Sequence, residues 1–373
     1  MSLPSFMNAT VIDNGKAVIK TVPLPQLDDE YILIKTKAVA GNPADWKLVK
    51  SDLGISSNGS VVGIDAAGEI VKLGPKVDAN KFHLGDYIYG FVTGGSQRRP
   101  DNGAFAEYVA LDSKIAFPVK NGLSGKNSIP EGPVDSLEAG ASIPCSWLTA
   151  GATLFYHMGL KMEWEPKQVQ IKGTVLIWGG ATALSLATLQ LFQKFNAFDK
   201  VVVVASKKHE AKLMKLGATE VFDYHDVDVI DKIKSKYSDL VWLLDCVSTP
   251  DTLNQVYQCA PTDCKSTVFN YMGLTVDAIK PELRNENITV DSTNIYTCLG
   301  FDVILGEYTV KADPKYREVV IKFVEFVSDK LIDGSLSHIP IKVYKNGLES
   351  TIRIMEDLEN GKNSGEKLVA TFN

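Results

Sequence analysis

Cysteine and histidine are scarce in this chain. Its 373 residues include five histidines and five cysteines, and no two cysteines form a C-x-x-C pair. This scarcity argues against cysteine-rich zinc motifs and predicts no disulfide framework, as in proteins of reducing compartments. The cysteines are Cys145, Cys246, Cys259, Cys264 and Cys298.

Positive charge and long apolar runs are also lacking. The 45 acidic residues outnumber the 39 basic ones, and the net charge is −6, so we expect no nucleic-acid partner. No run approaches the roughly 18 apolar residues of a membrane span. The start, MSLPSFMNATVIDNGK, lacks the basic and apolar parts of a secretory signal. We therefore expect no membrane partner and a cytoplasmic location, with the nucleus as the alternative.

The order of apolar runs predicts two kinds of domain. The first part has short runs rich in Val, Ile and Tyr, such as YILIKTKAVAG and DYIYGFV, which predict a barrel-like β domain. From about Leu148, strand-like runs such as VLIWG and VVVVAS alternate with helical segments, which predicts an α/β parallel sheet with helices on both faces. The tail adds an amphipathic helix from Pro314 to about Gly334 and a closing strand, KLVATF.

The stretch VLIWGGATALSLATL resembles a strand, tight turn and helix that bind a dinucleotide. On the G-x-G-x-x-G template, positions 180–185 keep only Gly180, and Thr182 and Ser185 replace the other glycines with small residues. The helix start still provides free N–H groups for a phosphate. By itself the turn is equally consistent with ordinary helix–strand packing.

The end of the next strand bears on the choice of cofactor. An Asp or Glu there would bind the ribose hydroxyls of NAD, but VVVVA is followed by Ser206, Lys207, Lys208 and His209. Two ammonium groups and no carboxylate at this point favour NADPH. The alternative is that the two lysines only begin a solvated helix face.

A series of motifs in order resembles the medium-chain dehydrogenase/reductase superfamily over essentially the whole chain. They include AGNPADWK, GIDAAGEIVKLGPKV, GAFAEYV, LTAGATL, WGGATALS, KLGATEVFDYHD, LLDCVS and SGEKLV. More narrowly, the chain is similar to a fungal zinc-independent branch. This branch includes toxD-like proteins, trans-acting enoyl reductases and, with the strongest likeness, yeast NADPH-dependent aldehyde reductases.

The resemblance implies a GroES-like β-barrel catalytic domain from residues 1–147 and 311–373, with a Rossmann domain at 148–310. It implies phosphate contacts at 181–184 and 206–209, an adenine contact at Tyr224, and a nicotinamide end near 270–272 and 365–367. The implied cofactor-binding residues are Gly180, Ala181, Thr182, Ala183, Leu184, Ser206, Lys207, Lys208, His209, Tyr224, Cys246, Val247 and Lys367. It leaves both a homodimer and a monomer open.

The residues that hold zinc in metal-dependent relatives are not reproduced here. Those relatives need a Cys, a His and a second Cys at the catalytic metal. The matching segments here read GNPAD at 41–45 and GID at 63–65, and Cys145 alone matches the second thiolate. The segment QRRPDNGAFAEYV has no cysteine for a structural zinc lobe. We therefore predict no metal site and interpret Cys145 as a buried, inert thiol.

Without a Lewis acid, hydrogen-bond donors or a cation must polarise the acceptor. In NPADWK, Asn42 offers an amide N–H, Lys47 offers a charge or proton, and Asp45 can orient Lys47. The alternative is a structural Asp45–Lys47 pair that faces away from the cofactor. Tyr271 is another candidate donor, or a passive lining residue, and water is a further proton source.

The sequence thus predicts a zinc-independent, NADPH-dependent reductase of small electrophilic carbonyl compounds: aldehydes, enones or quinones. One alternative is a trans-acting enoyl reductase that reduces C=C bonds. A second is an NADPH-binding sensor or interaction protein without turnover. Product analysis with an enal separates the first two, and NADPH consumption separates both from the third.

Overall fold

The computed structural model describes residues 3–50 and 57–372. The chain divides into two compact units: unit 1 combines residues 1–148 and 296–373, and unit 2 comprises residues 149–295. Among the helices that the structure describes, none has the length and hydropathy required to span a bilayer.

Unit 1 contains most of the strands. They are β1 (Phe6–Asp13), β2 (Lys16–Pro23), β3 (Tyr31–Ala40), β4 (Asp65–Leu73), β5 (Tyr87–Phe91), β6 (Tyr108–Asp112), β7 (Phe117–Val119), β8 (Ser128–Ile129), β15 (Val303–Leu305), β16 (Tyr308–Val310), β17 (Ile341–Tyr344) and β18 (Lys367–Thr371). Eight of them form one mixed sheet in the order β7-β5-β4-β3-β18-β17-β8, with β6 also paired with β3. The pairs β1–β2 and β15–β16 form separate two-stranded sheets.

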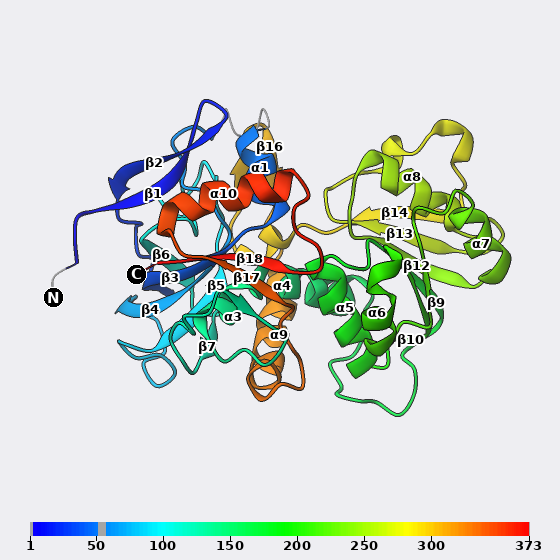
Figure 1. The fold of residues 1–373 in the computed structure, drawn as a ribbon, viewed down its shortest axis with the longest axis horizontal. Coiled ribbons are helices and arrows are strands. Elements are labelled where there is room, and N and C mark those ends of the chain that lie inside the picture. Colours follow the sequence, from blue (N-terminus) through cyan, green and yellow to red (C-terminus); the bar gives the residue numbers. More distant parts are fainter. Residues whose placement is uncertain (1–2, 51–56, 373) are drawn as a thin grey trace. The chain divides into compact units, whose positions relative to one another are not determined.

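The two ends of the chain meet in the middle of the unit 1 sheet. β18 runs antiparallel to β3, with Val369 opposite Ala40, and parallel to β17. Helix α10 (Gly347–Glu359) packs beside α1 (Pro43–Lys50), as Figure 1 shows in orange-red and blue. Gly41 permits this approach, because a Cβ at this position would lie 2.2 Å from Ile354 Cγ2. Segments from opposite ends of the sequence are thereby brought together.

Apolar side chains on these strands form one buried cluster. Ile32, Ile34, Val39, Val109 and Leu368 are essentially inaccessible to solvent. Each such side chain contributes about 1.5–3 kcal/mol on burial. The core of unit 1 therefore holds the N- and C-terminal segments in one layer. The remaining helices of this unit are α3 (Leu137–Ala141), most of α4 (Pro144–Ala152), and α9 (Pro314–Asp333), with the 3₁₀ turn η5 (Ile295–Leu299) at its boundary.

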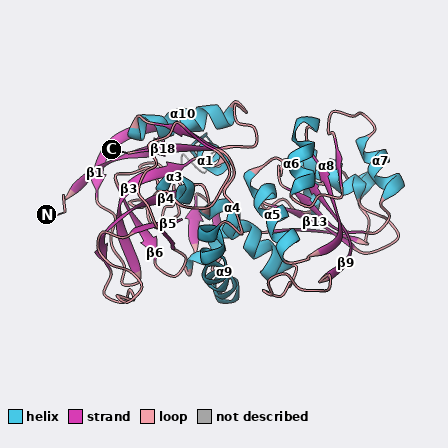
Figure 2. Ribbon diagram, turned by 60° about the horizontal axis from the view of Figure 1, so that its bottom comes forward, coloured by secondary structure: helices cyan, strands magenta, loops and turns pink. Residues whose placement is uncertain are grey.

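Unit 2 is a doubly wound parallel sheet, in the order β11-β10-β9-β12-β13-β14. Its strands are β9 (Ile171–Trp178), β10 (Phe198–Val204), β11 (Glu220–Phe222), β12 (Leu240–Asp245), β13 (Ser266–Asn270) and β14 (Ile288–Ser292). Its helices are α5 (Ala183–Lys194), α6 (Glu210–Lys215), α7 (Val229–Lys236) and α8 (Pro250–Cys259), with short 3₁₀ turns η2 (Lys207–His209), η3 (Val276–Ala278) and η4 (Pro281–Leu283) and a π turn η1 (Thr153–His157). Figure 2 shows this sheet with helices on both sides. Strand order reverses between β9 and β12, the point at which such sheets bind ligands at their carboxyl ends.

The predicted fold class, a GroES-like β domain with a Rossmann sheet, is confirmed. One domain boundary differs from that predicted, and the motif GAFAEYV is only partly a strand. β6 begins at Tyr108, because the N–H groups of Ala104 and Phe105 bond instead to Gly63 and Val62. The second boundary between units lies at 295/296, not at 310/311. β15 belongs to unit 1 because the Gln97 N–H donates to Ile304 O at 3.0 Å.

Candidate functional site

The turn after β9 has no room for side chains at its two glycines. Gly179 has φ = +84°, in the left-handed region that favours glycine. A Cβ at Gly180 would lie 2.1 Å from Val203 Cγ1 on β10. The backbone at 179–180 is therefore exposed at the carboxyl end of β9, as close approach of a phosphate requires.

The two residues that replace template glycines form a hydrogen-bonded chain. Thr182 is the N-cap of α5: its Oγ1 accepts from the Ser185 N–H at 3.2 Å and donates to Ser185 Oγ at 2.9 Å. Ser185 Oγ then donates to Gly179 O at 2.9 Å. The N–H groups of Ala183 and Leu184 have no partner among the described residues. The start of α5 thus keeps free donors and a positive dipole end for an anion.

Lysines lie at the end of β10, as predicted, but so do carboxylates. Lys207 Nζ donates to Glu210 Oε1 at 2.6 Å, and its backbone N–H donates to Asp223 Oδ2 at 3.1 Å. Lys208 has no ion pair among the described residues. The prediction that this end lacks an anionic side chain is therefore wrong, because Asp223 follows β11, the neighbour of β10 in the sheet.

The other two residues predicted for the phosphate and adenine end lie on the same edge of the sheet. Burial is the largest cause that lowers the pKa of His209, and the charges of Lys208 and Lys212 lower it further. This imidazole is therefore neutral near pH 7. Tyr224 is 50% exposed, and its ring lies against that of His225 with centroids 4.1 Å apart. A half-exposed aromatic ring is a surface on which a planar base can stack.

The loop after β12 is fixed by Asp245. Its Oδ1 accepts the N–H groups of Val247 at 3.0 Å and Ser248 at 2.9 Å. Ser248 has φ = +59°, and its Oγ donates to Asp245 O and accepts the Tyr271 N–H at 2.9 Å. This joins the loops after β12 and β13 and places Cys246 and Val247 at the carboxyl edge of the sheet.

The Tyr271 hydroxyl lies beside Thr153 and Cys246, without a well-formed hydrogen bond to either. Burial raises the pKa of Tyr271 well above its ordinary value, and raises that of the Cys246 thiol to about 12. Both groups keep their protons at neutral pH. Tyr271 thus remains a candidate donor, whereas Cys246 lacks the thiolate character of a nucleophile.

Unit 1 contains a buried cluster made by Asn42, Asp65 and Lys367. Lys367 Nζ donates to Asn42 Oδ1 at 2.6 Å and to Asp65 Oδ2 at 3.3 Å. Asn42 Nδ2 donates to Asp65 Oδ2 at 2.8 Å, and the Cys145 N–H donates to Asp65 Oδ1 at 2.8 Å. Burial raises the pKa of Asp65, but all of its recorded partners donate to it, which is the pattern of an ionised carboxylate.

Asp45 adjoins this cluster. Its Oδ2 accepts the Asn42 N–H at 2.7 Å at the start of α1, whereas Oδ1 is buried without a partner among the described residues. Burial raises the pKa of Asp45 to about 8. The Tyr296 hydroxyl from η5 also lies close to Asp45, Asp65 and Cys145, and burial raises its pKa. At neutral pH the Asp45 side chain is therefore largely a neutral acid.

Lys47 lies apart from these contacts. Its Nζ is 5.9 Å from the centroid of the Trp46 ring, and partial burial lowers its pKa. Within the described part of the chain it forms no ion pair with Asp45. Asp45 is thus hydrogen-bonded to Asn42. Lys367, which was predicted to bind the cofactor, is hydrogen-bonded to Asn42 and Asp65.

The segments that the sequence resemblance sets against zinc-binding segments, 41–45 and 63–65 with Cys145, meet around this ammonium group. Asn42, Asp65 and Cys145 come from those segments, and Lys367 Nζ lies on the first two. The described residues contain no group of three or more His, Cys, Asp or Glu side chains arranged to hold a metal ion. A cation here would have to displace the ammonium from its carboxylate, so the donor set does not fit zinc.

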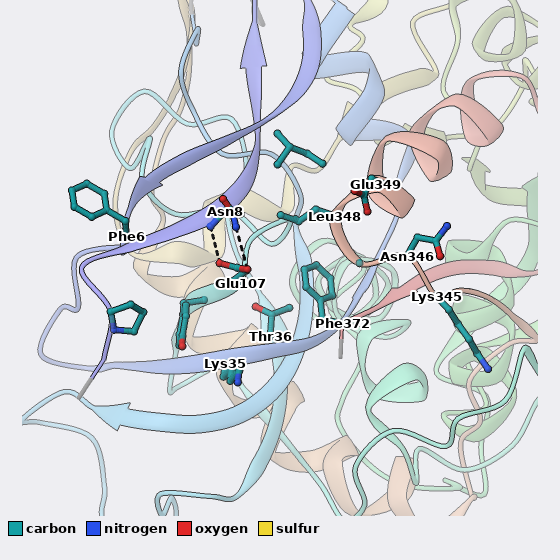
Figure 3. A pocket seen from close by; sticks show the side chains of 14 residues that line it. Phe6, Asn8, Lys35, Thr36, Glu107, Lys345, Asn346, Leu348, Glu349 and Phe372 are labelled. Atoms are coloured by element: carbon teal, nitrogen blue, oxygen red, sulfur yellow. Dashed lines mark hydrogen bonds between the residues drawn. The ribbon is translucent and has the colours of Figure 1, made fainter. Parts of the chain in front are cut away.

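A pocket of about 840 Å³ lies elsewhere on unit 1, between the β1–β2 hairpin and the start of α10 (Figure 3). Glu107 accepts the Asn8 N–H there at 2.7 Å, and the buried Thr36 hydroxyl has no partner among the described residues. None of the predicted cofactor-binding or catalytic residues lines this pocket. Its lining residues are Pro4, Phe6, Asn8, Ile19, Lys35, Thr36, Glu107, Tyr108, Lys345, Asn346, Gly347, Leu348, Glu349 and Phe372.

Sequence reasoning missed three polar residues at these sites. Asp65 begins the strand β4, and a carboxylate directly after the apolar run VVGI was a usable signal that it needs a buried partner. Asp245 ends β12 and Asp223 follows β11, at the carboxyl ends of strands, where parallel sheets gather functional side chains. Asp65 bonds to Lys367 and Asp223 to Lys207, which are distant in sequence, so only the fold identifies these two partners. Asp245 bonds instead to the nearby Val247 and Ser248.

Two family models match the chain: Alcohol dehydrogenase GroES-like domain over residues 28–121, and Zinc-binding dehydrogenase over residues 183–311. Uncharacterized protein YNL134C of Saccharomyces cerevisiae is 50% identical, covering 100% of this chain and 99% of that protein. Trans-enoyl reductase FSL5 of Gibberella zeae is 30% identical, and the match covers 99% of this chain and 98% of that protein.

Solved structures show the same fold. The quinone oxidoreductase from Coxiella burnetii superposes with a TM-score of 0.67 at 21% sequence identity, covering 99% of this chain and 100% of that one. The similarity to these relatives extends over the full length of the chain. It agrees with the two domain matches and with the observed topology of the two sheets. The chain therefore belongs to the medium-chain dehydrogenase/reductase superfamily, whose members are oxidoreductases that use NAD(P)H.

Proposed function

We propose that this protein is an NADPH-dependent, zinc-independent reductase of small electrophilic carbonyl compounds, with aldehydes as the leading substrates and enones or quinones as further ones. The observation that carries the proposal is the Asn42–Asp65–Lys367 cluster. It holds a buried ammonium on residues of the two segments 41–45 and 63–65, which the resemblance sets against zinc-binding segments. A fixed cation and amide donors polarise a carbonyl oxygen without a Lewis-acid metal.

The residues of unit 2 fit a nicotinamide dinucleotide. The exposed backbone at Gly179–Gly180 and the free N–H groups of Ala183 and Leu184 suit its pyrophosphate. Tyr224 offers a stacking surface for adenine. When bound, the reduced cofactor supplies a hydride.

The preference for NADPH over NADH is supported by Lys208. Its side chain is exposed at the end of β10 and has no ion pair among the described residues. The nearby carboxylate of Asp223 is engaged by the N–H groups of Lys207 and His225, which leaves fewer of its lone pairs for a ribose hydroxyl. The ammonium of Lys208, unpaired within the described part of the chain, favours an added phosphate on the ribose.

Reduction of C=C bonds is the second candidate activity, because a 30% identical relative is a trans-enoyl reductase. A test uses purified protein, NADPH and an α,β-unsaturated aldehyde. An allylic alcohol as product means C=O reduction, whereas a saturated aldehyde means C=C reduction. Both products start with hydride transfer, so the ratio of products decides between them.

A cofactor-binding protein without turnover is the third candidate. The experiment measures NADPH oxidation across a panel of aldehydes, quinones and enones, together with NADPH affinity by calorimetry. We expect oxidation with at least one class of acceptor. Tight binding with no consumption for any acceptor would refute the reductase proposal and leave a sensor or interaction role.

A further inference from the structure

The cluster in unit 1 has hydrogen-bonding capacity that the described residues leave unused. A lysine ammonium carries three N–H donors. Lys367 places one on Asn42 and one on Asp65, and the side chain is buried at 5% exposure. The third donor has no acceptor among the described residues. Buried donors are almost always satisfied, so this one has the capacity to bind an acceptor atom of water or of a substrate.

Asp45 has a matching deficit. Its Oδ2 is occupied by the Asn42 N–H, but Oδ1 is buried without a partner among the described residues. Asn42 connects the two groups that lack a partner, because its Oδ1 accepts a hydrogen bond from Lys367 and its backbone N–H donates one to Asp45. Lys367 lies close enough to Asp45 for its charge to lower the pKa of that carboxyl, and as a neutral acid Asp45 offers an O–H. One carbonyl oxygen, with two lone pairs, can accept both this O–H and the N–H of Lys367.

We propose that Lys367 and Asp45 bind the oxygen of the acceptor carbonyl, and that Asp65 and Asn42 are positioning residues that fix the ammonium. This inference rests on the proposed reductase function. It assigns Lys367 a different role from cofactor binding, and it replaces Lys47 as the cation of the site.

The chemistry balances with the reduced cofactor as the hydride donor. As the new C–H bond forms at the carbonyl carbon, the π electron pair of the C=O bond moves to oxygen. Lys367 stabilises the developing oxyanion, and Asp45 donates its proton to it, which yields the alcohol. Solvent then restores the proton on Asp45. With conjugate addition to an enone, the same two groups hold the enolate oxygen.

A contribution to stability does not by itself explain why the charges of Lys367 and Asp65 are buried. Replacing a buried ion pair with apolar residues of similar volume is often neutral or stabilising. Lys47 is a weaker candidate for the cation, because it is only partly buried and lies over Trp46 with no carboxylate to fix it. The geometry therefore favours Lys367.

The first test compares wild type with Lys367→Met in steady-state assays on an acceptor that wild type reduces. We expect kcat/KM to fall by about 10²–10³-fold, as for loss of one oxyanion donor. Cofactor affinity, measured by fluorescence titration of NADPH, should not change, because the phosphate and adenine residues lie in unit 2. The matched control is Lys342→Met, an exposed lysine on the neighbouring strand β17, which should leave both quantities unchanged.

Lys367→Met leaves the Asp65 carboxylate uncompensated and can impair folding. The double variant Lys367→Met with Asp65→Asn removes both charges and restores neutrality. If Lys367 and Asp65 had a purely structural role, the double variant would recover both kcat/KM and its unfolding midpoint. The proposal predicts that it recovers the midpoint but stays at the low kcat/KM.

Asp45→Asn tests the second donor. We expect the wild-type rate to fall as pH rises through about 8, and the variant to lose this dependence along with rate. The groups that face Asp45 are Asp65 on β4, Lys367 on β18 and Tyr296 on η5, so the profile should also shift in Asp65→Asn.

The outcomes separate the two proposals. If wild type oxidises NADPH and Lys367→Met retains full kcat/KM, the inference is wrong and the reductase function stands. Recovery of kcat/KM in the double variant would also overturn the inference. If none of the acceptors in the panel leads wild type to oxidise NADPH, the proposed function is overturned. The inference that rests on this function is then overturned too.

Discussion

Lys367 Nζ donates to Asn42 Oδ1 at 2.6 Å, although 325 positions separate the two residues in the chain. The contact exists because β18 pairs with β3, which leads directly into α1. A residue of the closing strand thus supplies the cation of a site whose other members come from the first 65 residues and from α4. Four predictions follow from this contact and from the sites in unit 2.

Removing the Lys367 ammonium should destabilise the protein. Lys367→Met leaves a buried carboxylate unpaired, which costs about 3–5 kcal/mol of the free energy of unfolding. Adding Asp65→Asn should return most of that loss. Urea unfolding monitored by fluorescence measures both, with Lys342→Met as the control. A loss under about 1 kcal/mol in the single variant would show that the Lys367–Asp65 pair is solvated rather than buried.

Stability should fall with pH through Asp45. Its folded-state pKa of about 8 exceeds an unfolded value of about 3.9, so the native state retains a proton that the unfolded state releases. Between these two values the free energy of unfolding decreases as pH rises, by up to about 1.4 kcal/mol per pH unit from this group. Below pH 4 the full contribution is present, and above pH 8 it is lost.

The measurement is urea unfolding of wild type and Asp45→Asn at several values of pH between 5 and 9. The variant should show a flatter dependence, because Asn does not titrate and still accepts the Asn42 N–H. Asp329→Asn, an exposed position on α9, is the matched control. Parallel curves for wild type and Asp45→Asn would contradict the raised pKa.

Gly180→Ala should impair both folding of unit 2 and cofactor binding. Its Cβ would lie 2.1 Å from Val203 Cγ1, and overpacking of this kind costs about 1–3 kcal/mol. In a Val203→Ala background the same change should cost less, because the opposing methyl is gone. Gly132→Ala, where nothing lies within 4 Å of the added Cβ, is the control. Equal costs in both backgrounds would mean that the turn moves freely.

Lys208→Ala should weaken NADPH binding about tenfold and leave NADH binding unchanged, through loss of one charge-assisted hydrogen bond. Calorimetric titration of both cofactors measures this. Lys234→Ala, an exposed lysine on α7, is the control. Wild-type affinity for NADH equal to or above that for NADPH would refute the cofactor preference itself, and Asp223 would then be the residue to examine.

Much of the fold was predictable because its signals are local. The alternation of apolar strands and helices from residue 148 marks the parallel sheet, and Gly180 with small residues after it marks the turn. Boundaries were less predictable at 104–105 and 296–310, where backbone groups bond to segments that are distant in sequence.

The candidate sites were predictable only in part. The residues at 180–184 and 206–209 follow strands, so their place at the sheet edge follows from topology. The roles of Asp65 and Asp223 were not predictable, since a carboxylate's effect depends on which donors reach it.

The sequence by itself determined the superfamily, the two sheet types and the departure from the zinc-ligand pattern, because these depend on residue identity and on spacing along the chain. The tertiary structure alone decided which lysine meets a buried carboxylate, that Asp45 bonds to Asn42 rather than to Lys47, and that a carboxylate lies beside the lysines at the end of β10. Charge, burial and hydrogen bonding act through space over a few ångströms, and only folding sets which distant residues come that close.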